Sequence, residues 1–342
     1  MRAWGRATLM VCGLAMAVML TLAAFGLPVG DSVRLMFDGS LGDPFAISRS
    51  LVKAIPLTLT GLGIVVSWRA GMYNIGGEGQ FILGGLAGGL AAKLALGAAW
   101  PDRIVTVAVL AASMAGGAVW AWMAGWLQVK RGVQVVISTI LLNFVAMQIL
   151  GYAVMGPLQE KSRELPLSDE LPSGVMLPRF SPQADLHWGA LIAVSAALAV
   201  YVWLFWTPGG YRARLIGQNE RAARAGRIPA GRVQMGAMAL SGALCGLAGG
   251  VELAGTAGQL GTSFSQQWGF LAIPVALLAG LHPLAVVASA VFFGALFAGS
   301  DNLSRFTASG ATLVYVIQAV AVLGYVGLEA WTRRSRRWVE AA

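Results

Sequence analysis

Long apolar segments recur along most of the chain and are separated by short polar stretches. Ten of these segments are candidate membrane spans, at residues 8–29, 51–69, 78–98, 103–127, 133–155, 187–206, 234–254, 268–281, 284–300 and 309–331. A helix needs about 20 apolar residues to cross the hydrocarbon core of a bilayer. The pair 268–281 and 284–300 is short, so a single re-entrant hairpin is the alternative there. The pattern predicts an all-α integral membrane protein, with about ten transmembrane helices in a single domain over residues 1–342.

Composition and charge support a membrane protein independently. The chain is 57% hydrophobic and 11% charged, whereas a soluble domain carries about 25% charged residues. If the N-terminus is cytoplasmic, 15 of the 24 basic residues fall on the cytoplasmic side, as the positive-inside rule expects. We therefore expect a multi-pass protein of the bacterial cytoplasmic (inner) membrane, with both termini cytoplasmic. Its basic charge then matches anionic membrane lipids, and no nucleic acid is expected as a partner.

The N-terminal segment, residues 1–29, has the charge order of a secretion signal, with Arg2 and Arg6 ahead of an apolar core. The core is long enough to span, and its removal would place the basic C-terminus on the side opposite the basic loops. We therefore expect an uncleaved first helix.

The loop at residues 207–232 interrupts the apolar pattern with positive charge. It holds one acid, Glu220, against six arginines, at positions Arg212, Arg214, Arg221, Arg224, Arg227 and Arg232. Its sequence predicts one helix from about Tyr211 to Gly226, stopped by Pro229. Such a helix would bring Ala222, Ala223 and Gly226 together on a smooth face that another surface can approach. The alternative is a solvated basic loop that only fixes orientation.

The external loop at residues 155–186 is the one sizeable hydrophilic segment on the other side. Its five prolines oppose a regular helix; they are Pro157, Pro166, Pro172, Pro178 and Pro182. The loop is either a flexible connector or part of a docking surface for an external solute-binding protein.

Polar residues inside the spans are few, and each has two interpretations. Asn74 is expected to cap the helix that begins near Gly76, with Glu78 in its first turn, where the helix dipole favours an anion. Asn143 and Gln148 lie in the fifth span, where interhelical hydrogen bonds are one role. The rival role for these residues, and for Gln80, is to line a translocation path.

Several kinds of chemistry lack their sequence signature. The chain contains no Gly-x-x-x-x-Gly-Lys-[Ser/Thr] phosphate-binding loop, so it is not expected to hydrolyse ATP itself. His187 and His282 lie in no metal-ligand cluster, and Cys12 and Cys245 both fall in predicted spans. We expect a non-catalytic transport subunit with no metal and no cofactor. An ion-coupled secondary transporter is the more distant alternative, but a convincing midplane pair of acids is missing.

Three ordered segments resemble the permeases of ATP-binding cassette (ABC) importers for branched-chain amino acids, ribose, simple sugars and nucleosides. Residues 212–228 resemble the family's cytoplasmic coupling loop, with Arg214 as a small departure. Residues 70–80 resemble its Gly-x-x-Asn-Ile-Gly-x-Glu-Gly-Gln signature and lie closest to the nucleoside branch, which is linked to an external lipoprotein. Residues 269–284 resemble a third motif, from which Pro274 and Ala285 depart.

The resemblance implies a fold similar to that of the vitamin B12 importer permease, with alternating access driven by separate ATPase subunits that bind the ATP. It implies a second permease subunit, often a different chain, and an external solute-binding protein. Nucleosides are the expected solutes, with simple sugars or branched-chain amino acids as alternatives. The residues expected to couple to the ATPase are Arg212, Arg214, Gly217, Asn219, Ala222, Ala223 and Gly226. The residues expected along the translocation path are Asn74, Glu78, Gln80, Asn143 and Gln148.

Overall fold

The computed structural model describes most of the chain as helix. It covers residue 16, residues 18–181 and 184–306, and the isolated positions 316, 319, 320, 323, 324 and 327. Within these residues seven helices are long and apolar enough to cross a membrane, which confirms the all-α membrane fold. The predicted count of ten stays a prediction, because most of the span at 309–331 and part of the span at 8–29 lie outside the described residues, as do Cys12 and the basic terminal segments.

The chain divides into two compact units, which are described separately. The first comprises residues 1–53 and 292–342, and the second comprises residues 54–291. The first unit contains α2 (Val29–Leu41), the beginning of α3 (Pro44–Arg69) and the end of α12 (Pro283–Phe306). Leu22 and Leu303 are fully buried in its apolar core. Lys53 makes an ion pair with Asp301 at 2.6 Å.

Helix α2 was not predicted from the sequence, because its apolar residues are interrupted by charged ones. With 13 residues it is also shorter than the length needed to span a bilayer. Helix α3 begins at Pro44, seven residues before the predicted boundary. Proline is well accommodated there, because a residue at a helix start needs no backbone hydrogen-bond donor.

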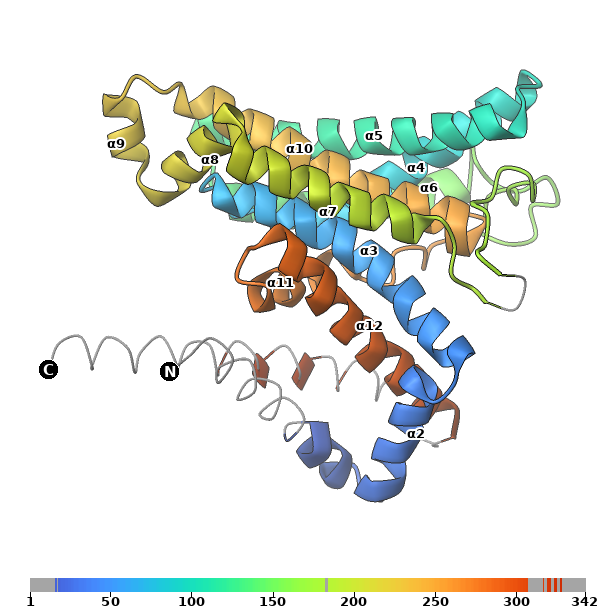
Figure 1. The fold of residues 1–342 in the computed structure, drawn as a ribbon. Helices are drawn as coiled ribbons and strands as arrows, with labels where there is room; N and C mark the ends of the chain where they lie inside the picture. Colours follow the sequence, from blue (N-terminus) through green and yellow to red (C-terminus); the bar gives the residue numbers. More distant parts are fainter. Residues whose placement is uncertain are drawn as a thin grey trace, which may run out of the picture. The chain divides into compact units, whose positions relative to one another are not determined.

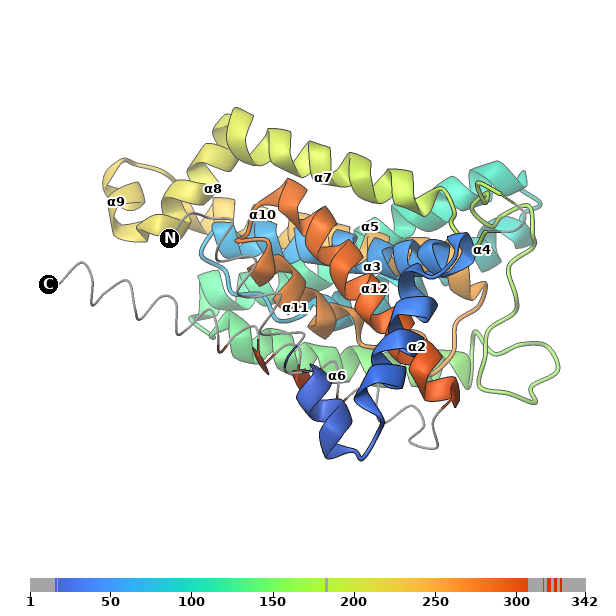
Figure 2. The same ribbon diagram turned by 60° about the horizontal axis from the view of Figure 1, so that its bottom comes forward.

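The second unit is built around α4 (Gly77–Gly97), α5 (Asp102–Arg131) and α10 (Ala230–Glu252), which lie side by side (Figures 1 and 2). Glycines make this packing close: a Cβ added to Gly84 would lie 2.3 Å from the Cα of Gly246. Small residues allow membrane helices to approach in this way. The unit also contains α6 (Val135–Val154), α7 (Gly189–Trp206) and the π-helix η1 (Leu253–Ala257).

The segment predicted as two short spans or one hairpin is a short helix followed by a long one. Helix α11 (Trp268–Leu278) has 11 residues and contains Pro274, so it extends only about 17 Å. Helix α12 has 24 residues and is long enough to span. The predicted boundary at residue 300 was therefore too early for α12.

The two ends of the second unit differ in character. Helices α8 (Pro208–Gln218) and α9 (Glu220–Ala225) lie at one end, and the segment 155–188 lies at the other (Figures 1 and 2). Backbone amides of the segment donate to the chain that follows α10: Leu171 to the carbonyl of Gly258 at 2.8 Å, and Leu177 to that of Ala254 at 2.7 Å. These bonds attach residues 171–177 to the chain that follows α10, and whether the segment serves as a connector or as a docking surface stays a prediction.

Candidate functional site

The basic loop folds as two short helices instead of the single predicted helix. Thr207 caps α8, because its hydroxyl oxygen accepts a hydrogen bond from the amide of Gly210 at 3.2 Å. Asn219 has extended backbone geometry, so it ends α8 and starts α9. Its side-chain oxygen accepts from the amide of Ala222 at 3.0 Å. The chain therefore turns at Asn219, a bend that a continuous helix over 211–226 would not have.

The predicted smooth face of alanine and glycine is divided between the interior and the surface. Ala223 is fully buried and packs with Ile216 and Ala230 in a small apolar cluster. Ala222 and Gly226 are exposed. Of the three residues predicted to form one contact surface, only Ala222 and Gly226 are accessible to another protein, and Ala223 holds α9 in place.

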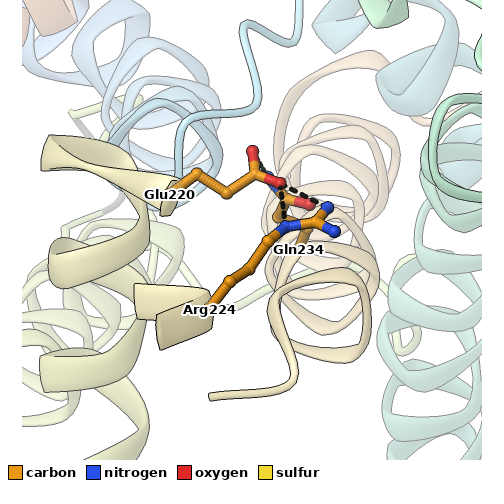
Figure 3. A network of polar contacts seen from close by, with 3 residues as sticks. All are labelled: Glu220, Arg224 and Gln234. Carbon is orange, nitrogen blue, oxygen red and sulfur yellow. Dashed lines mark hydrogen bonds and ion pairs between the residues drawn. The ribbon is translucent and has the colours of Figure 1, made fainter. Parts of the chain in front are cut away.

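A polar network fixes α9 against α10, as Figure 3 shows. The Glu220 carboxylate accepts two hydrogen bonds from the Arg224 guanidinium, at 2.9 and 2.6 Å. The same carboxylate accepts from the Gln234 amide of α10 at 3.3 Å. The single acid of the loop thus connects the two helices, and one of the six arginines serves this internal purpose.

The other predicted coupling residues of α8 point in different directions. Arg212 is exposed. The Arg214 guanidinium lies 5.0 Å from the centre of the Phe205 ring, a cation–π contact with α7. Arg214, the residue at which the sequence departs from the family motif, therefore ties α8 to the preceding span.

Gly217 joins α8 to the segment that carries the polar signature. A Cβ on Gly217 would lie 2.2 Å from the carbonyl oxygen of Arg69, at the end of α3. Gly71, two residues after Arg69, has a positive φ of 75° and lies close to Gly217. Only glycine permits this approach and this backbone geometry together. Helix α8 thus lies directly against the turn that leads into residues 74–80.

Asn74 lies at the centre of a buried hydrogen-bond network. Its amide nitrogen donates to Gln80 and to the Ser241 hydroxyl of α10, both at 3.0 Å. Its amide oxygen accepts from the backbone of Gly76 at 2.8 Å and from Gln80 at 3.0 Å. This oxygen closes a tight turn just before α4, and Gly76 itself occupies the cap position that was predicted for Asn74. Such a network gives a buried polar segment one well-defined conformation.

Asn143 and Glu78 are also engaged inside the chain. Asn143 of α6 accepts from the amide of Gly79 at 2.8 Å and donates to the carbonyl of Ile75 at 3.0 Å. The Glu78 carboxylate accepts from the Ser265 hydroxyl and, at 2.8 Å, from the amide of Gly269. These bonds support interhelical positioning for both residues, and any contact with solute stays a prediction.

Gln148 differs from the other predicted path residues. It lies on α6 about one and a half turns beyond Asn143, but it is exposed on the surface of this chain. Sequence reasoning did not identify Ser241 of α10 or Ser265, which precedes α11, and it placed Gly269 in the third motif without predicting its contact. The contacts of these three residues carry no local signal, because their partners lie more than 160 positions away in the chain.

His187 anchors the opposite end of the unit. It is buried, and its Nδ1 accepts a hydrogen bond from the amide of Gly189 at 3.1 Å. Burial lowers the pKa of this histidine to about 4, and the nearby positive charge of Arg179 contributes to the shift. No group of three or more His, Cys, Asp or Glu side chains suited to a metal ion occurs in the described part of the chain.

Comparisons with known proteins agree with this architecture. Residues 46–326 match the family described as "Branched-chain amino acid transport system / permease component". The chain is 33% identical to a glucose ABC transporter permease protein, TsgB13 of Haloferax volcanii, over 92% of this chain and 84% of the relative. It is 28% identical to two guanosine ABC transporter permease proteins of Bacillus subtilis. The match to NupP covers 92% of this chain and 90% of the relative, and the match to NupQ covers 82% and 92%.

Proposed function

This chain belongs to the family of permease components of branched-chain amino acid transport systems, and from that premise we propose that it couples ATP hydrolysis by partner subunits to import of nucleosides. The family works with ATPase and solute-binding partners. The observation that carries the proposal is the close contact of Gly217 with Arg69 and Gly71, because it links a surface-exposed helix pair to the buried polar segment 74–80.

The proposed docking surface for the ATPase is the exposed side of α8 and α9. It comprises Gln218, Arg221, Ala222, Ala225 and Gly226. The small residues allow close approach, and the arginines flank them with positive charge. With this surface in the cytoplasm, the segment 155–188 faces outward, and we propose that it docks a solute-binding protein. From the distribution of basic residues along the sequence, we also propose that both chain termini lie in the cytoplasm.

Nucleosides are the proposed solutes, because the signature at residues 70–80 is of the nucleoside type and two relatives are named for guanosine. Glucose is the second candidate, because a relative with 33% identity is named for it. The polar residues of the signature do not separate the two, since Asn74, Gln80 and Asn143 all bond within the chain.

A second, different permease chain is proposed to complete the pathway. NupP and NupQ, two permease proteins of one organism, are both named for guanosine. Gln148 then has a defined role: an exposed amide in a spanning helix is costly against lipid, so we place it at the second permease or at the aqueous path between the two.

The test is uptake of radiolabelled guanosine and glucose by cells that express the complete transporter, with and without this chain. A Walker-type ATPase variant serves as the energy control. Chain-dependent, ATPase-dependent guanosine uptake supports the proposal. Chain-dependent glucose uptake alone would keep the permease function and reject the nucleoside assignment, whereas uptake that persists with inactive ATPase would reject ATP coupling.

A further inference from the structure

An open apolar groove runs along α7 at the end of the second unit that carries the segment 155–188. It encloses about 720 Å³. Its lining includes Leu110 of α5, Leu247 of α10, and Ile192, Ala196 and Ala199 of α7. The side chains from α7 are small at several of these positions, so the helix leaves room that larger residues would fill. Its long walls belong to α5 and α7, which are both long and apolar enough to span a membrane, so the groove faces lipid along these helices. Met176, Leu177 and Pro178 of the segment 155–188 also line it.

The length of the groove matches one leaflet. From Trp188 to Ala199 the lining of α7 covers 11 helical steps, or about 16 Å at 1.5 Å per residue. Half of a hydrocarbon core of about 30 Å is about 15 Å. An apolar molecule in the groove would therefore reach from the membrane surface to the middle of the bilayer, as one acyl chain of a lipid does.

The mouth of the groove has the chemistry of a membrane–water interface. Trp188 is 51% exposed at the start of α7, and tryptophan is enriched at the headgroup level. Arg103, in the first turn of α5, is exposed and lines the same mouth. Arg103 also lines an adjoining pocket together with Asp102 and Arg179, but it is the one charged residue among those that line the groove. The guanidinium is thus the charged group at this opening, and it suits a phosphate.

We propose that this groove is a phospholipid-binding site, in which one acyl chain lies between α5 and α7 and Arg103 binds the lipid phosphate. The occupant follows from three features together: the bilayer depth of the groove, its apolar walls and the cation at its opening. A lipid there would fill the space beside α7, the helix that continues through Thr207 into α8.

The test uses the complete transporter reconstituted in lipid with phosphatidylglycerol that carries a photoreactive diazirine in one acyl chain. A diazirine fatty-acid ester without phosphate is the comparison probe. We expect cross-links concentrated on peptides 103–110 and 188–199. Arg103→Gln should lower the yield with phosphatidylglycerol about tenfold, the effect of losing one charge-assisted hydrogen bond, and should leave the yield with the ester unchanged.

Two matched variants of α7 distinguish the groove from the general lipid surface. Ser195 lines the groove, and Ser195→Trp should fill it and lower the groove cross-links at least several-fold. Val194, at the same depth, is exposed but does not line the groove, and Val194→Trp should leave the cross-links unchanged. Cross-links spread evenly over all lipid-facing helices, or an equal effect of the two variants, would overturn the proposal.

Discussion

Two adjacent alanines of α9 provide a sharp test of the proposed coupling surface. Ala222 is exposed, whereas Ala223 is fully buried against Ile216 and Ala230. We compare Ala222→Arg with Ala223→Arg, which add the same side chain one position apart. The sequence alone placed Ala223 among the residues expected to contact the ATPase. The structure predicts instead that Ala223→Arg damages the permease itself.

The magnitude follows from what holds α9 in place. The Asn219 cap contributes about 1 kcal/mol, and the exposed Glu220–Arg224 ion pair contributes about 0.3–0.5 kcal/mol. Overpacking a filled site costs about 1–3 kcal/mol, and a guanidinium without a partner adds to this cost. In Ala223→Arg the penalty equals or exceeds these anchors, so we expect α9 to detach from α8 and α10. In Ala222→Arg the new side chain extends into water and α9 stays in place.

The assay is limited trypsin digestion of the purified transporter, followed by ATP hydrolysis and uptake. Each variant adds one arginine, so the number of potential cleavage sites is matched. We expect rapid cleavage within residues 219–228 only for Ala223→Arg. Ala222→Arg should digest like the unchanged protein but lose ATP-driven uptake. Full uptake by Ala222→Arg would refute the docking surface, and a wild-type digestion pattern for Ala223→Arg would refute the packing argument.

Three further outcomes are expected. Glu78→Gln replaces one of the two carboxylate oxygens that accept from Ser265 and Gly269 with an amide donor, so the abundance and melting temperature of the transporter should fall while the solute concentration for half-maximal uptake stays unchanged; a stable variant with selectively weakened uptake would contradict this. Gly217→Val places a side chain against the Arg69 carbonyl and should raise the ATP hydrolysed per solute transported, whereas an unchanged ratio would reject the link between α8 and residues 69–71. His187 has its pKa lowered from 6.5 to about 4, so the unfolded histidine binds more protons between these values. The attachment of segment 155–188 should therefore be strongest above pH 6.5 and weaken toward pH 4, by on the order of 3 kcal/mol. Hydrogen exchange at the Leu177 amide checks this, and His187→Gln should flatten the pH profile.

The sequence predicted the class of fold because apolar length and charge bias are strong, local signals. The break inside the basic loop was harder to predict, although its signal was present. Asn219 followed by Glu220 is a favourable helix start, with a capping side chain and an acid in the first turn. Good helix formers on both sides obscured it, and the local pattern favoured one helix. In the structure, the Asn219 cap and the burial of Ala223 favour two short helices over one continuous helix.

The sequence singled out several polar residues of the buried network but did not predict their contacts. Asn74, Glu78 and Asn143 stood out because polar side chains are rare in spans. Their partners were not predictable, because serine and glycine are common in membrane helices and carry no mark of what they will face. Ser265 and Gly269 lie 187 and 191 positions after Glu78 in the sequence, and they meet its carboxylate only when the chain has folded.

The hydrogen bonds of the buried amides distinguish residues that hold the structure from residues that are free to contact a solute. A buried amide whose donors and acceptors are used within the chain cannot bind solute without breaking those bonds, and leaving such a group unpaired costs about 1–3 kcal/mol. Asn74, Gln80 and Asn143 all use their side-chain amides in this way. They therefore suit a structural role, in which they hold the segment between the α8 contact and α4 in one conformation. Gln148 is exposed on the same helix as Asn143, and it can meet a second subunit or a solute without that cost. The exposure of Gln148 therefore supports the proposal that a second permease chain faces this side of α6.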